Sequence, residues 1–262
     1  MKRLVAIAAL GAGALAGVEP SAAPTLVRDA ATGVSQYLVA LPHIAYGGGF
    51  RTKVVIRNTS SSVADVTLNF YGAGGNPLLV PFGGVGADHT SVTVPPNGVR
   101  YVEPDWQGQE SGGWAGLVYT NSGVKIQGIF MWHNPADPAD KYTESAAPVI
   151  SLAPAACLIP LPSASSTITM PYDETEGRFS GYGFANTTSA AVTMSLTFYD
   201  QEGQIVGQYS QVLAGFEHVQ LLVSDKVSSV ANSKGTMQIT GQGIVPLGFR
   251  FTPYYTFTTW MP

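Results

Sequence analysis

A stretch of fourteen residues that occurs twice constrains the fold of this chain more than any other feature. Asn58–Tyr71 reads NTSSSVADVTLNFY and Asn186–Tyr199 reads NTTSAAVTMSLTFY, and the copies align without a gap at an offset of 128 residues (186 − 58). Asn, Thr, Leu, Phe and Tyr recur at aligned positions. Because a constant offset over this length is hard to obtain by chance, the sequence predicts two copies of one structural unit.

The second part of each copy alternates between apolar and polar side chains. In the first copy, Val66, Leu68 and Phe70 share one face of an extended chain, and the residues between them share the other. This two-residue period is typical of a half-buried β-strand. The Asn and Ser/Thr cluster at the start of each copy predicts a polar turn, because these side chains bond nearby backbone groups.

Composition favours short strands throughout the chain. Charged residues make up 11% of the 262 residues, against roughly 25% in typical soluble domains. The chain has 30 Gly and 18 Pro, which suit turns and argue against long helices with a charged wet face. Short strands about every ten residues therefore predict an all-β chain of two tandem immunoglobulin-like β-sandwich domains.

The predicted organisation follows from the repeat and from one apolar segment. Ala146–Ser165 contains no charged residue and is rich in Ala and Pro, so the boundary between the modules is expected within it. Because the segment is apolar, the modules are expected to pack on each other. The predicted parts are a signal peptide (1–16), a leader or first strand (17–40), a first β-sandwich module (41–155), a linker (156–166) and a second module (167–262).

Three turns predict hairpins. After the repeat strand, the turn at 72–77 predicts that Leu78–Phe82 pairs back onto it. Asn121-Ser122-Gly123 predicts a hairpin between 115–120 and 124–132. Gly241-Gln242-Gly243 is its counterpart in the second module.

The N-terminus predicts export. Met1–Ala16 has a basic start, an apolar run too short for the roughly 18 residues of a membrane span, and an Ala-Leu-Ala end typical of signal-peptidase sites. No cysteine directly follows that run, which excludes a lipid anchor of the lipoprotein type. The expected location is secreted, extracellular or cell-surface, with the periplasm as an alternative, and no membrane span is expected after cleavage.

The predicted leader contains a segment that could pair either within its own chain or with another subunit. Val34–Leu41 reads VSQYLVAL and predicts a strand. It is either an ordinary edge strand or linker of its own module, or a strand that inserts into a neighbouring subunit to build an extracellular fibre.

Charge and cysteine content exclude some functions. The net charge is −4 and the only basic cluster is Lys2-Arg3, so no surface is expected to neutralise nucleic-acid phosphates. The single cysteine, Cys157, excludes an internal disulfide and a cysteine-based zinc site. It is expected to be a buried thiol, with an intermolecular disulfide as the alternative.

No catalytic or cofactor-binding residue can be assigned from a motif. The chain has no G-x-S-x-G nucleophile elbow, and its four histidines form no close metal-binding pair. Each histidine is therefore expected to be structural or at the surface (His43, His89, His133, His218). The chain is expected not to be an enzyme, although a hydrolase with an unrecognised pair of carboxylates remains an alternative.

Two acidic loops are candidates for Ca²⁺, which takes carboxylate oxygens from loops. Asp173, Glu174 and Glu176 lie in YDETEG, and Asp137 and Asp140 lie in NPADPADKYTE. Neither loop has the calcium-loop pattern of EF-hands, so a solvated loop is the other interpretation. No other cofactor is expected.

Aromatic side chains are the candidates for ligand binding. Trp106 and Trp114 lie in a Gly-rich loop, and Tyr254, Tyr255 and Trp260 lie near the C-terminus. Exposed rings with amides beside them suit sugar stacking or a protein interface. The alternative is that these rings cap the ends of two cores.

Six short phrases occur in order along the chain: Ile44–Thr52, Asn58–Ser62, Gly75–Leu78, Val94–Gly98, Gly113–Ala115 and Thr143–Pro148. Together they resemble a group of uncharacterised exported bacterial proteins common in acidobacterial genomes, which open on F-A-x-G-G-G-W-x-T and continue with G-N-P-L and V-P-P-x-G. Phe50 replaces the usual Trp. The resemblance covers about residues 40–262 and implies a secreted β-sandwich protein without a known reaction, so no catalytic residue carries over.

The sequence therefore predicts a secreted or cell-surface, non-catalytic, structural or adhesive protein. Its expected partners are other extracellular proteins or polysaccharide, with self-association through strand edges. The alternatives are a carbohydrate-binding module that uses exposed aromatic rings, a fibre subunit and a secreted hydrolase.

Overall fold

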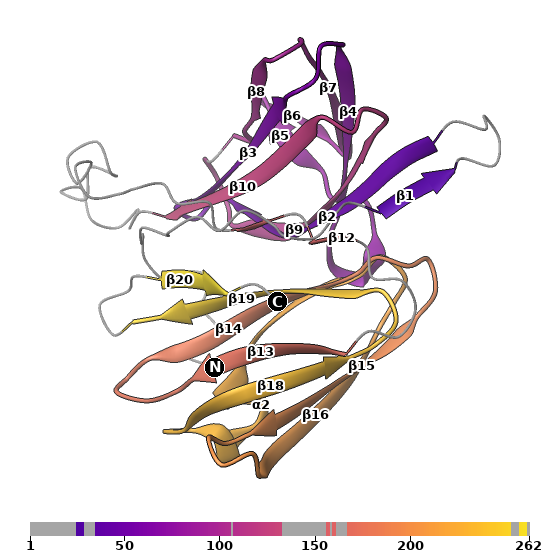
Figure 1. The fold of residues 1–262 in the computed structure, drawn as a ribbon. Helices are drawn as coiled ribbons and strands as arrows, with labels where there is room; N and C mark the ends of the chain where they lie inside the picture. The colour runs from indigo at the N-terminus through magenta and orange to yellow at the C-terminus, as the bar shows by residue number, and fades with distance from the viewer. Residues whose placement is uncertain are drawn as a thin grey trace.

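The computed structural model describes residues 25–28, 35–105, 107–132, 156–157, 159–160, 167–252 and 257–260. These residues form antiparallel strands in stacked sheets, with one short α-helix, α2 (Val223–Lys226) (Figure 1). The predicted all-β class and the β-sandwich are confirmed. In the described part of the chain, no helix has the length and apolar character needed to cross a membrane. The predicted signal peptide lies outside the described residues.

The N-terminal sandwich, residues 25–160, contains two main sheets. One sheet has the strand order β1-β2-β9-β4-β7, with β12 also paired to β2, and the other has the order β11-β10-β3-β8. A separate two-stranded sheet joins β5 to β6. The bounds are β1 Thr25–Arg28, β2 Ser35–Tyr46, β3 Phe50–Asn58, β4 Ala64–Tyr71, β5 Val80–Phe82, β6 Val85–Ala87, β7 His89–Val94, β8 Val99–Val102, β9 Ser111–Tyr119, β10 Val124–Trp132, β11 Ala156–Cys157 and β12 Ile159–Pro160.

The C-terminal sandwich, residues 167–260, also contains two sheets. Their orders are β13-β18-β15-β16 and β17-β14-β19-β20. Figure 1 shows this sandwich beneath the N-terminal one, in orange and yellow. The bounds are β13 Ile168–Asp173, β14 Phe179–Asn186, β15 Val192–Tyr199, β16 Ile205–Leu213, β17 His218–Leu222, β18 Lys234–Thr240, β19 Ile244–Phe251 and β20 Phe257–Trp260.

The two sandwiches have the same strand order. If β1, β5, β6 and β12 are set aside, the strands of each sandwich, counted along the chain, have the orders 1-6-3-4 and 5-2-7-8. An immunoglobulin domain instead places strands A, B, E and D in one sheet and C, F and G in the other, which is 1-2-5-4 and 3-6-7. The immunoglobulin-like part of the prediction is therefore not confirmed by this connectivity.

Asn58 and Asn186, the first residues of the two repeats, end β3 and β14 and are fully buried. Asn58 Nδ2 donates to the carbonyl oxygens of Ser62, Val94 and Pro95 at 2.7–3.2 Å. Asn186 Nδ2 donates to the corresponding carbonyls, those of Ala190, Leu213 and Ala214, at 2.8–3.4 Å. Each side-chain oxygen accepts from the residue two positions later. The predicted polar turn is thus an internal clamp that joins three chain segments.

The hairpins predicted at Asn121–Gly123 and Gly241–Gly243 are wrong. Strand β9 pairs with β2 and β4, and β10 pairs with β3 and β11, so the first turn crosses from one sheet to the other. The second turn likewise connects β18 and β19, which belong to different sheets. The physical reason is burial. The core of a sandwich lies between its two sheets, and Leu117 of β9 and Ile126 of β10 approach the same core from opposite sheets.

The hairpin predicted for Leu78–Phe82 is also wrong. Strand β4 pairs on that side with β7, and β5 pairs with β6. Pro77 and Pro81 have no backbone N–H, so this segment cannot supply a regular ladder to β4. The contact is limited to an isolated bridge between Tyr71 and Pro77, in which Leu78 N donates to Phe70 O at 3.0 Å and Gly72 N donates to Asn76 O at 2.9 Å.

The predicted boundary at 40/41 falls within a paired strand, and the predicted linker contains two paired strands. Strand β2 runs continuously through the predicted boundary at 40/41 and pairs with β9 of its own chain. Strands β11 and β12, inside the predicted linker, pair with β10 and β2. The backbone of Cys157 faces Gln127 in this pairing.

One apolar core extends across both sandwiches. The N-terminal core includes Leu68 of β4 and Leu117 of β9, both at most 1% exposed. Three residues of the C-terminal sandwich belong to this same cluster: Leu247, Phe251 and Phe257. A second cluster, with Phe184, Phe198 and other buried residues, fills the C-terminal sandwich. The two sandwiches are thus packed directly against each other.

Candidate functional site

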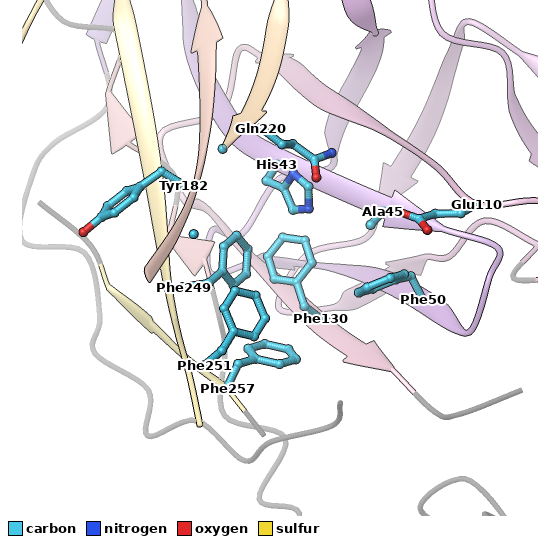
Figure 2. A pocket seen from close by; sticks show the side chains of 12 residues that line it. His43, Ala45, Phe50, Glu110, Phe130, Tyr182, Gln220, Phe249, Phe251 and Phe257 are labelled. Atoms are coloured by element: carbon cyan, nitrogen blue, oxygen red, sulfur yellow. The ribbon is translucent and has the colours of Figure 1, made fainter. Parts of the chain in front are cut away.

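The junction between the sandwiches contains a pocket. Its empty volume is about 520 Å³, which includes its open mouth. Strands β2, β3 and β10 supply one side, and β14, β17, β19 and β20 supply the other (Figure 2). The lining residues are His43, Ala45, Phe50, Glu110, Phe130, Gly181, Tyr182, Gly183, Gln220, Phe249, Phe251 and Phe257.

A β-bulge places His43 in this pocket. The register between β2 and β9 shifts between Leu41 and Ile44, so Pro42 and His43 have no regular partner across the ladder. A bulge bends a strand and re-aims a side chain. Strand β2 therefore contributes Leu41 and Ile44 to the N-terminal core and His43 to the junction.

His43 contacts His218, which lies 175 residues later in the sequence. The Nδ1 atom of His43 lies 3.2 Å from Nε2 of His218, and the two rings stack with centroids 5.2 Å apart. Both side chains are buried. Burial lowers the pKa of His43 to about 4, and burial together with the proximity of His43 lowers the pKa of His218 well below its usual value. At neutral pH the pair is uncharged, so one ring donates and the other accepts.

Phenylalanine rings form the apolar wall around His43. The Phe130 and Phe249 rings lie 5.5 and 5.3 Å from the His43 ring. Phe251 and Phe257 continue this cluster at centroid separations of 5.9–6.0 Å. Such distances are typical of stabilising aromatic pairs. The wall is therefore ordered by its own packing, before any ligand is present.

The rim of the pocket carries two polar side chains, Glu110 and Gln220, both exposed to solvent. Partial burial of the Glu110 carboxyl nevertheless raises its pKa. The pocket thus combines an apolar interior with a carboxylate and an amide at its mouth, which is the usual composition of a small-molecule site.

Trp114, predicted to be an exposed ligand-binding ring, is instead 3% exposed, so that prediction is wrong. Its ring stacks on Tyr71 at 4.7 Å, and Tyr71 stacks on Phe216 of the C-terminal sandwich at 5.0 Å. Trp114 Nε1 donates to Phe216 O at 2.8 Å. A buried indole requires such an acceptor. Trp114 therefore joins the two sandwiches.

Of the other aromatic candidates, Trp260 is the one within the described residues. Trp260 is half-buried against the C-terminal core, 6.5 Å from the Tyr182 ring. Trp106, Tyr254 and Tyr255 lie outside the described residues. The sugar-binding hypothesis therefore keeps Trp106 as an untested candidate and loses Trp114.

The carboxylates of YDETEG each have a separate structural partner. Asp173 accepts from Arg250 Nε and Nη2 at 2.9 and 2.6 Å, and Glu174 accepts from Ser180 N at 2.7 Å. Glu176 pairs with Arg178. Partial burial alone would raise the pKa of Asp173, but hydrogen bonds from Thr175 and Arg250 lower it. Within the described ranges, no group of three or more His, Cys, Asp or Glu could hold a metal ion. Asp137 and Asp140 lie outside those ranges.

Sequence reasoning missed the junction pocket. His43 and His218 were treated as separate structural residues, and the phenylalanines were assigned only to strands. The two histidines lie at different points of the two modules, in β2 and β17, so the repeat gave no signal for their contact. The sequence does carry one signal, because Gly181 and Gly183 lie within a strand, where glycine often marks a close approach of other groups. In the structure, an added Cβ on Gly181 would lie 2.9 Å from Phe251, and one on Gly183 would lie 3.2–3.3 Å from the two histidines.

Comparisons with known proteins do not place the chain in a family. No protein-family model matches it, and no curated protein matches its sequence. Among solved structures, it is similar to a "putative secreted protein" from Parabacteroides distasonis, with 9% identity, 89% of this chain and 91% of that chain covered, and a TM-score of 0.24. A β-glucuronidase of glycoside hydrolase family 2 matches at 9% identity and a TM-score of 0.17, covering 95% of this chain and 25% of that one. Likenesses at these scores carry no argument about fold or function.

Proposed function

We propose that this chain is an exported, non-catalytic β-sandwich protein with a structural or adhesive role outside the cytoplasm. Its partners are other extracellular proteins or polysaccharide. The observation that carries the proposal is the shared core, in which Leu247, Phe251 and Phe257 of the second sandwich pack into the core of the first. Two sandwiches fixed in this way form one stiff body, which can hold its loops and strand edges at a constant separation.

The repeated turns support a scaffold role. Asn58 and Asn186 donate equivalent hydrogen bonds in the two copies. The carboxylates are not repeated, because Asp65 aligns with Thr193 and Asp200 aligns with Gly72. No acid, base or ligand is thus shared by the two copies. We infer that a scaffold was duplicated and that binding lies where the copies differ.

The outer edge of the C-terminal sandwich supports an adhesive role. Strand β16 is the last strand of its sheet, and two of its apolar side chains, Ile205 and Val212, are 59% and 62% exposed. Edge strands offer unpaired backbone groups to a partner strand, and exposed apolar side chains add contact area. Large apolar residues exposed on one edge strand suit contact with another protein.

Two measurements test the proposal. Cell fractionation with surface labelling is expected to place the full-length chain outside the cytoplasm. The purified chain is expected to bind members of a panel of immobilised extracellular proteins and polysaccharides, and Ile205→Lys with Val212→Lys should weaken protein binding at least about tenfold. Val85→Lys, which changes an equally exposed residue on β6, is the matched control. Retention in the cytoplasm, or turnover of a polysaccharide substrate, would overturn the proposal.

A further inference from the structure

The junction pocket has the composition of a cation site. Its walls include the side chains of Phe50, Phe130, Phe249, Phe251 and Phe257, and the face of a phenylalanine ring is negative at its centre. Among the described residues that line it there is no Lys or Arg, and the one basic side chain among them, His43, is uncharged at neutral pH. The carboxylate of Glu110 is the single formal charge among the lining residues that the structure describes. The electrostatic field inside the pocket therefore favours positive charge.

Glu110 is held at the rim by the glycine turn that follows β2. Gly47, Gly48 and Gly49 all have positive φ, at 71°, 57° and 93°. An added Cβ on Gly48 would lie 2.8 Å from Cβ of Glu110, and one on Gly47 would lie 2.2 Å from Gln109 O. Gly48 N also donates to Gly108 O at 3.0 Å. The bare backbone of this turn therefore packs directly against the segment that carries Glu110.

The Glu110 carboxylate has no counter-charge within the described part of the chain. The other carboxylates near the junction differ: Glu103 pairs with Arg51 and Lys53, and Asp173 pairs with Arg250. In Figure 2 the Glu110 carboxylate lies beside Ala45 and above Phe50, on the pocket side. The exposed Glu110 carboxylate is hydrated when the pocket is empty, and a bound cation would gain an ion pair with it.

We propose that the junction pocket binds a small organic cation, an amine or quaternary ammonium compound. The cationic group lies between the ring of Phe50 and the Glu110 carboxylate. The apolar remainder of the ligand lies against Phe130 and Phe249. This combination of aromatic faces and one carboxylate discriminates cations from neutral molecules of the same shape. The site goes beyond the proposed structural role, since that role needs no ligand.

Choline and its uncharged isostere 3,3-dimethylbutan-1-ol provide the test, since they differ in charge and hardly in shape. Both are titrated into the full mature chain at pH 8 by calorimetry and by NMR. Choline is expected to bind about five to thirty times more tightly than the isostere, as expected for cation–π and carboxylate contacts. Its affinity should fall as salt is added.

Variants separate the two contributions. Glu110→Gln is expected to weaken choline binding at least about fivefold and to leave isostere binding unchanged. Phe50→Leu keeps an apolar side chain but removes the aromatic ring, so it should weaken choline binding more than isostere binding. Glu202→Gln, at an exposed turn far along the chain, is the matched control and should change neither. Thermal unfolding of each variant checks that the fold is retained.

Three outcomes would overturn the proposal: equal binding of choline and its isostere, choline binding that Glu110→Gln leaves unchanged, or no binding of either compound at about 10 mM.

Discussion

The two sandwiches share a strand order but differ in how they connect the third strand to the fourth. In the C-terminal sandwich, β15 turns into β16 through Asp200–Gln204, with Asp200 N bonded to Gln204 O at 2.9 Å. In the N-terminal sandwich, the corresponding connection contains η1 (Ala73–Gly75) and the small β5–β6 sheet. The scaffold is thus the same, and the longer connection is an addition to one copy.

The longer connection lies against the other sandwich. His218 N donates to Gly72 O at 3.2 Å, and an added Cβ on Gly75 would lie 1.7 Å from Gly215 O. Gly203, at the corresponding turn, has no atom within 4 Å of its added Cβ. The contact with the other sandwich is thus made by the connection between the third and fourth strands, which differs between the two copies, while the strand order is the same in both.

Replacing the buried asparagines gives the largest expected effect. Asn58→Ala and Asn186→Ala each remove three bonds from a buried side chain to backbone carbonyl groups, so each should lower the free energy of unfolding by about 3–5 kcal/mol. Urea unfolding checks the values, with Asn76→Ala, an exposed asparagine, as the control. Losses that differ by more than about 2 kcal/mol would mean that the two clamps are not equivalent.

The histidine pair should make the junction sensitive to acid. Because burial lowers the pKa of His43 from 6.5 to about 4, the unfolded chain binds a proton before the folded chain does. The stability from the neutral pair is therefore fully present above pH 6.5 and is lost as pH falls toward 4, by about 3 kcal/mol for His43.

The control for the acid effect lies on an exposed strand. Unfolding free energies measured from pH 7 to pH 4 should fall less steeply in a His43→Gln, His218→Gln double variant. His89→Gln, where an exposed histidine pairs with Asp88, should retain the slope of the parent chain. A double variant with an unchanged slope would refute the buried pair as the source.

Replacing the glycines of the two corresponding turns is expected to give the smallest changes in stability. Gly75 and Gly203 both have positive φ, at 75° and 79°, so an alanine costs about 1 kcal/mol of backbone strain at either position. Only Gly75→Ala must also displace the backbone at Gly215, so it should cost about 2–3 kcal/mol and Gly203→Ala about 1 kcal/mol. Thermal unfolding of the two variants measures the difference between their losses of stability. Equal losses would show that the longer connection is not in close contact with the second sandwich.

The local sequence pattern predicts where the strands lie but does not predict which strands pair with each other. The alternation in Asn58–Tyr71 predicts β4 well, because burial on one face leaves a two-residue period. The turn at Asn121–Gly123 was misread because a short polar turn has the same residues whether it joins neighbours in one sheet or crosses to another. Sheet membership depends on distant strands, and no local signal encodes it.

The site was beyond sequence reasoning for a related reason. His43 and Glu110 are isolated polar residues in the sequence, and only the bulge in β2 and the packing of the glycine turn bring them to one pocket. Trp114 was misjudged because its Gly-rich neighbours suggested a loop, whereas those glycines allow strand β9 to pass close to Tyr71. Gly113, for example, leaves no room for a Cβ beside Tyr71 O.

The strand order has a consequence for the speed of folding. Strand β3 pairs with β10, so Asn58 meets Val124 only after the intervening chain has been made, and the core that covers them also needs Phe251 and Phe257. Contacts between residues far apart in sequence slow folding, because the entropy of closing long loops is lost before the contacts form. The first sandwich can therefore complete its core only when β19 and β20 are available, so strands β2 to β4 reach their final state only after β20 has been synthesised.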